Sequence, residues 1–214
     1  MSLVLDDSLA PELYPLAWLV GTWRGPGVLA YPGIPDGGVV ADLVVTHDGG
    51  PYLQYTWTLA TGPALAHDAQ LSPDDVRELT AGEVWAQESG FWRPATGAEA
   101  LPVQGARADS PAPTAIEVLL AEAAGVAAVL AGSAQGPRID LVSEWVASTP
   151  SSPAAVTAMR RMYGWVRGEI FWSHELAAFG QELQSYASGR LVRLDAPAAT
   201  SAAASAGPAA AADE

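Results

Sequence analysis

Cysteine is absent from this chain of 214 residues. Disulfides, thiolate nucleophiles and cysteine-ligated metal sites are therefore excluded. Positive charge is scarce too: the ten basic residues are all arginine, against 24 acidic residues, and the formal net charge is -14. Nucleic acids and anionic membrane surfaces both need clustered basic residues, so we expect neither as a partner.

Long apolar runs are also missing. No stretch approaches the roughly 18 apolar residues of a membrane-spanning helix. The segment from Met1 to Leu13 carries Asp6, Asp7 and Glu12, where a secretory signal would carry positive charge followed by an apolar stretch. We therefore expect a cytoplasmic protein, either a monomer or a homodimer.

The length and the hydrophobic fraction of 50% suit one barrel or sandwich domain with a sizeable core. We expect an N-terminal extension over residues 1–13 and the domain itself over residues 14–195. Residues 196–214 consist mainly of Ala, Pro, Ser and Gly. Such a composition buries too little surface to offset its ordering entropy, so this tail is predicted to be disordered.

Short strand patterns separated by turn signals recur along the chain. They predict an all-β fold, either a barrel or a sandwich. Residues 60–82 are expected to form a loop with a turn at Pro73-Asp74-Asp75, and residues 152–161 a short helix or irregular segment. The expected strand regions are 21–27, 38–46, 52–59, 83–94 with a bulge at Gly90, 116–131, 139–145, 162–176 and 191–194.

The segment 116–131 tests this prediction because its many Ala, Leu and Glu residues favour helix. Gly125 and Gly132 interrupt it at hairpin spacing, and a strand pattern continues at Ile139. We therefore predict strands here.

A glycine-rich motif surrounds the first strand, Gly21-Thr22-Trp23-Arg24-Gly25-Pro26-Gly27. The glycines indicate a backbone that is approached closely on one face, and the spacing lets Trp23 plug one end of a closed sheet. Preceded by the apolar run 16–20, whose Trp18 is expected to seal the barrel end, the motif resembles the first strand of the nitrobindin family. The resemblance extends over residues 14–194. It implies a small β-barrel that binds ferric haem, similar in shape to fatty-acid-binding proteins and lipocalins. With the strand pattern, this resemblance leads us to expect a single closed antiparallel barrel of about ten strands.

The same resemblance implies a histidine that holds the haem iron, after a stretch that reads Leu-Ala-Ala-Phe-Gly-Gln here, residues 176–181. Placed without gaps, this position falls on Tyr186 and the family's pocket methionine on Leu176. A second pocket histidine falls on Ala86, beside Trp85. Both histidines are therefore replaced.

A tyrosine must lose a proton of pKa about 10 before it becomes a good iron ligand. Arg190, four residues after Tyr186, is a candidate positive partner that would lower this pKa. The favoured interpretation is a tyrosine packed with its hydroxyl at the barrel mouth.

Two further groups of polar residues were considered as sites. His174 shares a strand face with Trp172 and Leu176, and we expect a hydrogen-bonded residue lining the pocket, with iron ligation as the alternative. Glu83 with Glu88, and Asp74 with Asp75, have the spacing of paired carboxylates. For both pairs a solvated surface position is predicted.

The sequence leaves three functions open. The leading hypothesis is a non-enzymatic nitrobindin-like barrel without haem-iron coordination, and without another cofactor, that binds a small apolar ligand. The second is a ferric haem protein that binds nitric oxide or converts peroxynitrite to nitrate, as the resemblance implies. The third is an interaction module whose large side chains fill the barrel.

Overall fold

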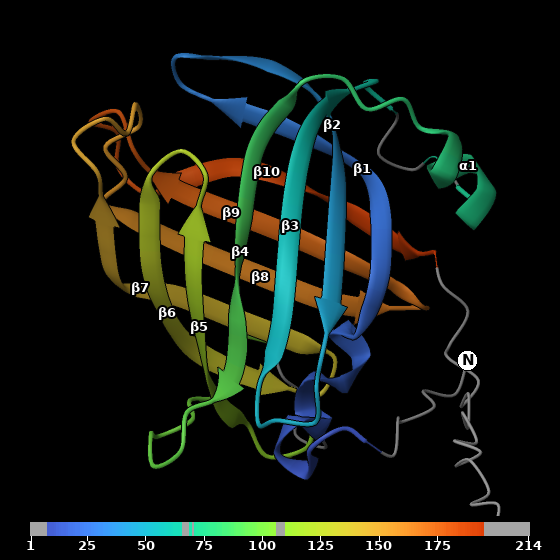
Figure 1. Cartoon of the computed structure of the whole chain (residues 1–214), viewed down its shortest axis with the longest axis vertical. Helices are drawn as coiled ribbons and strands as arrows, with labels where there is room; N and C mark the ends of the chain where they lie inside the picture. Colours follow the sequence, from blue (N-terminus) through green and yellow to red (C-terminus); the bar gives the residue numbers. More distant parts are fainter. Residues whose placement is uncertain (1–7, 66–68, 70, 106–109, 195–214) are drawn as a thin grey trace, which may run out of the picture.

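The computed structural model describes residues 8–65, 69, 71–105 and 110–194. Ten antiparallel strands close into one barrel, as predicted (Figure 1). Each strand pairs with its neighbours in sequence, and the first pairs with the last. The strands are β1 (Gly21–Tyr31), β2 (Ile34–Thr46), β3 (Leu53–Gly62), β4 (Val84–Pro94), β5 (Thr114–Glu122), β6 (Val126–Gln135), β7 (Arg138–Ser148), β8 (Ala158–Val166), β9 (Glu169–Ala177) and β10 (Gln184–Arg193).

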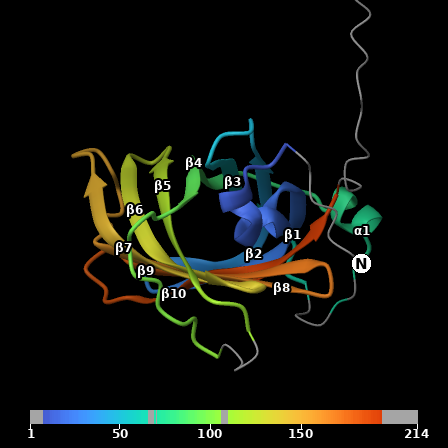
Figure 2. The ribbon, with the colours of Figure 1, turned by 90° about the horizontal axis from the view of Figure 1, so that it is seen from below.

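A 3-10 helix, η1 (Pro11–Leu19), covers one end of the barrel (Figure 2). The apolar run expected to lead into the first strand is therefore helical, with Pro11 at its start and Pro15 inside it. Trp18 is buried in the barrel core, which agrees with its expected sealing role. Leu9 and Leu13 belong to the same core. The structural unit thus includes residues that the expected boundary placed in the N-terminal extension.

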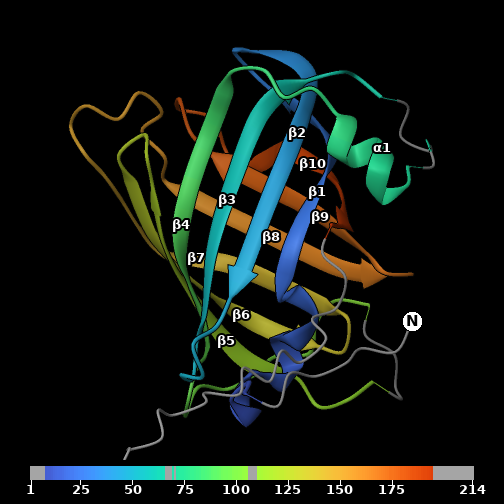
Figure 3. The same cartoon turned by 45° about the vertical axis from the view of Figure 1, so that its right-hand side comes forward.

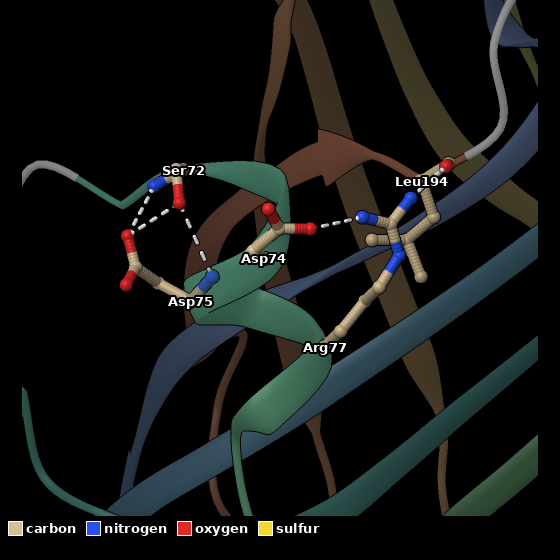
Figure 4. Close-up of polar contacts among 5 residues, drawn as sticks. All are labelled: Ser72, Asp74, Asp75, Arg77 and Leu194. Atoms are coloured by element: carbon tan, nitrogen blue, oxygen red, sulfur yellow. Dashed lines mark hydrogen bonds and ion pairs between the residues drawn. The ribbon is translucent and has the colours of Figure 1, made fainter.

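A short helix, α1 (Pro73–Glu78), packs outside the barrel (Figure 3). The predicted turn at Pro73 is the first turn of this helix, because Ser72 caps it. The Ser72 hydroxyl accepts from the Asp75 amide, and the Asp75 carboxylate accepts from the Ser72 amide at 2.7 Å (Figure 4). Arg77 bonds Asp74 at 2.7 Å and the Leu194 carbonyl, which ties the helix to the end of β10. Asp74 and Asp75 are exposed, as predicted.

Trp23 is buried at the end of the barrel that η1 covers, and the strands approach each other closely at Gly25 and Gly27. Trp23 is 1% exposed, and its indole N–H donates to the Leu19 carbonyl of η1 at 2.8 Å. The Arg193 guanidinium lies 4.2 Å from the centroid of the ring. A Cβ atom at Gly25 would lie 2.1 Å from the Arg190 carbonyl oxygen, so β10 can approach β1 only because this residue is glycine.

Gly25→Ala is therefore expected to lower the free energy of unfolding by about 1–3 kcal/mol, because backbone atoms of β10 must move to admit the methyl group. Chemical denaturation measures the change. Gly164→Ala in β8 is the control, since a Cβ there meets nothing within 4 Å. Equal stability of the two variants would contradict the assigned role of Gly25.

Several local predictions are corrected by the register. Residues 116–131 do form two strands joined at Gly125, but Gly132 lies inside β6 and not at a turn. A Cβ at Gly132 would be 1.9 Å from the Asp140 carbonyl oxygen, so this glycine serves close strand packing. Gly90 pairs regularly on both sides and makes no bulge.

The other differences concern where strands begin and end. Residues 152–157 are irregular, and β8 begins at Ala158, within the segment expected to be helical or irregular. β10 begins at Gln184, seven residues before the expected strand. The predicted tail, residues 196–214, lies outside the described residues. No helix in the described part of the chain is long and apolar enough to cross a membrane.

Candidate functional site

A cavity of about 160 Å³ is lined by side chains from the barrel strands, among them the first residues of β4. This end of β4 lies at the end of the barrel opposite η1 (Figure 1). All five site residues proposed from the sequence line the cavity: Trp85, Ala86, His174, Leu176 and Tyr186. Trp57, Leu59, Val126 and Met159 supply further apolar wall, while Glu88, Glu122, Glu175 and Arg161 supply charge. With Ile34 of β2, the cavity collects residues from eight strands.

Two β-bulges aim Trp85 and Tyr186 at the cavity. In β4, Ala86 and Val84 pair with the consecutive residues Leu59 and Ala60, so Trp85 is the extra residue. In β10, Ser185 and Ala187 pair with Glu175 and His174, so Tyr186 is the extra residue. A bulge re-aims a side chain that regular pleating would place elsewhere. The Trp85 indole N–H donates to the Tyr186 hydroxyl at 2.5 Å, which joins the two bulges across the cavity.

The Tyr186 hydroxyl does not readily lose its proton. Burial raises its pKa to about 12, and the hydrogen bond from Trp85 only partly opposes this shift. Arg190, the candidate positive partner, instead faces the Glu169 carboxylate at 3.8 Å. The Tyr186 ring packs edge-on against Tyr31, with centroids 5.9 Å apart. Tyr186 is thus a packed, protonated side chain near neutral pH.

The most buried charges of the site were missed by the sequence analysis. The Arg161 guanidinium forms a two-pronged ion pair with the Glu88 carboxylate, one contact being 2.6 Å. Tyr55 donates to the same carboxylate at 2.9 Å. The predicted surface position of Glu88 is therefore wrong, because the side chain is only 7% exposed.

The alternation of inward and outward residues along β4 and β8 could have placed Glu88 and Arg161 inside the barrel. Glu88 shares the inward face of β4 with Ala86 and Trp92, as the burial pattern shows. Arg161 lies between Met159 and Tyr163 at every second position of β8, so all three share the inward face. The pattern of β8 was not read because residues 152–161 were expected to be helical or irregular.

His174 points inward and is hydrogen-bonded, as the favoured interpretation predicted. Its Nε2 atom lies 2.9 Å from the Tyr163 hydroxyl, and Trp57 and Trp172 pack against the ring. Burial, and then the charge of Arg161, lower its pKa well below the ordinary value of 6.5. The imidazole is therefore neutral at physiological pH.

Glu122 ends the inward row of β5, after Val118 and Leu120. Its side-chain carboxylate has no hydrogen bond or ion pair with any described residue. Burial, and then the negative charge of Glu88, raise its pKa above the ordinary 4.5, and Arg161 only partly offsets this. A carboxylate in this position costs folding free energy once it ionises.

Glu122→Gln is therefore expected to stabilise the fold at pH 7. Because folding raises the pKa of the Glu122 carboxyl, the protonated side chain contributes stability below pH 4.5. This contribution is lost as the pH rises through the pKa of the folded state. The stability gain of the variant should shrink to nothing as the pH falls below 4.5. Thermal unfolding at both pH values measures it, with exposed Glu144→Gln as the control, and a variant less stable than the parent at pH 7 would refute this account.

Metal-ligand clusters do not occur in the described ranges: no group of three or more His, Asp or Glu side chains is placed to hold an ion. The interior is also incompletely filled, although Trp57 and Trp172 pack edge-on with centroids 4.9 Å apart. The site is thus a small cavity with several aromatic side chains in its wall, a buried ion pair and one carboxylate that has no partner among the described residues.

Comparison with known proteins decides the family. Residues 12–193 match the family described as "THAP4-like, heme-binding beta-barrel domain". The chain belongs to this family, the THAP4/nitrobindin barrels.

Nitrobindin-family relatives match along most of their length. A "Ferric nitrobindin-like protein" of Beutenbergia cavernae is 48% identical over 91% of this chain and 100% of the relative. A "Peroxynitrite isomerase" of Leifsonia xyli subsp. xyli is 33% identical, over 89% of this chain and 98% of the relative. The crystal structure of Rv2717c from M. tuberculosis superposes with a TM-score of 0.62 at 26% identity, and covers 86% of this chain and 98% of that one.

In this nitrobindin-family barrel, the site residues expected from the resemblance and the charged residues found only in the structure line the same cavity. Tyr186 and Leu176 were found through the glycine motif and the stretch at 176–181, and both line the cavity. Glu122 was not singled out in the sequence, because a glutamate at the end of a strand has no local feature that reports its neighbours.

Proposed function

We propose that this chain is a nitrobindin-family barrel that binds a small apolar molecule in its cavity and does not coordinate haem iron. One observation carries the proposal: the side chain at the expected iron-ligand position, Tyr186, is a protonated phenol held by Trp85 inside a cavity of about 160 Å³.

The residues of the cavity do not fit a haem. Iron would need the Tyr186 phenolate, but burial raises the pKa of this group to about 12. The other candidate, His174, has its Nε2 atom engaged by the Tyr163 hydroxyl. Glu122, the one carboxylate of the cavity wall without an ion pair among the described residues, would also repel the carboxylates of a haem.

Size supports a ligand smaller than a cofactor. Pockets for drug-sized molecules span roughly 300–1,000 Å³, whereas an apolar protein cavity of about 150 Å³ takes up benzene or xenon. At about 160 Å³ the present cavity has the size for one substituted aromatic ring. The remaining space also argues against the third hypothesis, a barrel filled completely by its own side chains.

Binding of benzyl alcohol, measured by calorimetry, tests this proposal. We expect saturable binding by the parent protein and its loss in Ala86→Phe, because Ala86 lines the cavity and a larger side chain would occupy it. Val28→Ala, an exposed position on β1, is the matched control and should bind like the parent. No binding by the parent, or equal binding by Ala86→Phe, would overturn the proposal.

A further inference from the structure

We propose that the cavity selects small organic cations, an ammonium group on an aromatic or apolar body, with Glu122 as the counter-ion. This inference rests on the proposed function, since it names the chemical class of the ligand for the same cavity. Three features support it. Glu88 and Glu122 are neighbours on adjacent strands, only Glu88 has a positively charged partner, and aromatic side chains line the same cavity as Glu122.

Glu88 and Glu122 are direct cross-strand partners of β4 and β5. Like charges in this position repel each other and destabilise a sheet. Glu88 is compensated, because Arg161 grips both of its oxygens and Tyr55 donates to one of them. Glu122 receives no such contact from the described residues.

The charges around the cavity therefore do not balance. Three carboxylates and one guanidinium line it. The charges of Glu88 and Arg161 cancel in their ion pair. Glu175 is paired with Arg160, which lies 3.9 Å from it and is not part of the cavity wall. One negative charge remains, on Glu122. A ligand cation would supply the missing partner, whereas a ligand anion would meet uncompensated repulsion in a medium of low dielectric constant.

The walls suit a cation in a second way. Trp57, Trp85, Phe179 and Tyr186 line the cavity, and aromatic faces attract ammonium groups. No protonated histidine opposes a cation, because the pKa of His174 is lowered by its burial and then by Arg161.

Three probes of one shape and different charge test the inference in the parent protein at pH 7: benzylamine, benzyl alcohol and benzoate. Charge-assisted hydrogen bonds are stronger than neutral ones. We expect benzylamine to bind at least about tenfold more tightly than benzyl alcohol, and benzoate to bind most weakly. Calorimetry gives the three dissociation constants.

Glu122→Gln should remove the preference, so that benzylamine binds no more tightly than benzyl alcohol. Glu144→Gln, an exposed glutamate on β7, should keep it. Benzyl alcohol binding as tightly as benzylamine in the parent, or a preference that survives Glu122→Gln, would overturn the cation inference while the proposed function stands. Binding of none of the three probes would overturn both.

Discussion

Trp23→Ala is expected to lower the free energy of unfolding by about 3–5 kcal/mol, the range for truncation of a fully buried tryptophan. Trp23 is 1% exposed, it joins η1 to β1 through the Leu19 carbonyl, and it carries the Arg193 guanidinium on its face. Its loss opens a cavity and unties the helix that covers this end of the barrel. Urea denaturation with an unchanged m-value would isolate the effect on stability.

Trp145→Ala provides the matched control, because Trp145 lies on β7 and is 58% exposed. Exposed positions of this kind usually change stability by no more than about 0.5 kcal/mol. A Trp23→Ala variant as stable as Trp145→Ala would mean that Trp23 does not plug the barrel.

Arg161→Met should be similarly costly, about 3–5 kcal/mol, because it leaves the buried Glu88 carboxylate without its counter-ion. The repulsion between Glu88 and Glu122 would then be uncompensated as well. Adding Glu88→Gln removes the stranded charge, so the double variant is expected to recover part of the loss. Thermal and urea unfolding of the single and double variants give this coupling free energy.

Arg160→Met is the control for this pair of variants. Arg160 neighbours Arg161 in sequence but has a 40% exposed side chain and a 3.9 Å contact with Glu175. Exposed ion pairs contribute about 0–1 kcal/mol. If Arg161→Met lowered the stability no more than Arg160→Met, the buried Glu88–Arg161 ion pair would not be important for the stability of the barrel.

Strand alternation and turn residues were sufficient to predict an all-β fold from the sequence, and the resemblance carried by the glycine motif favoured a closed barrel over a sandwich. Apolar residues at every second position place one face of each strand inside, and the glycines of β1 mark where β10 approaches closely. The segment 116–131 shows why this evidence outweighs helix propensity: Val118 and Leu120 are buried, whereas Leu119 between them is exposed.

The polar part of the cavity could not be predicted in the same way. Arg161 reaches Glu88 across 73 positions of sequence, and no local pattern reports such a contact. Trp85 and Tyr186 meet across 101 positions only because each is the extra residue of a bulge. Bulges shift the face of a side chain by one residue, so simple alternation gives the wrong direction for both.

The unpaired Glu122 also bears on function. A side chain that destabilises the fold is a common cost of a binding site. Stabilisation by Glu122→Gln at pH 7 together with loss of benzylamine preference would link the two properties to the same carboxylate.

A histidine at position 186, where the resemblance places the family's iron ligand, provides a direct test of haem binding. Imidazole needs no deprotonation at pH 7, so Tyr186→His supplies a competent ligand. Combined with Trp85→Met, which removes the indole bonded to Tyr186 and enlarges the cavity, this double variant separates the two obstacles to haem binding. A defined Soret maximum in the double variant alone is expected if the missing imidazole and the Trp85 indole are what exclude haem, whereas no uptake would contradict the existence of a haem pocket in this barrel.

Haem titration of the purified parent protein tests the central claim most directly. Because Tyr186 is protonated and held by Trp85, the account predicts only the diffuse absorption of haem adsorbed to a hydrophobic protein. A sharp Soret band with stoichiometric uptake by the parent would contradict it, and loss of that band in Tyr186→Phe or in His174→Ala would identify the ligand.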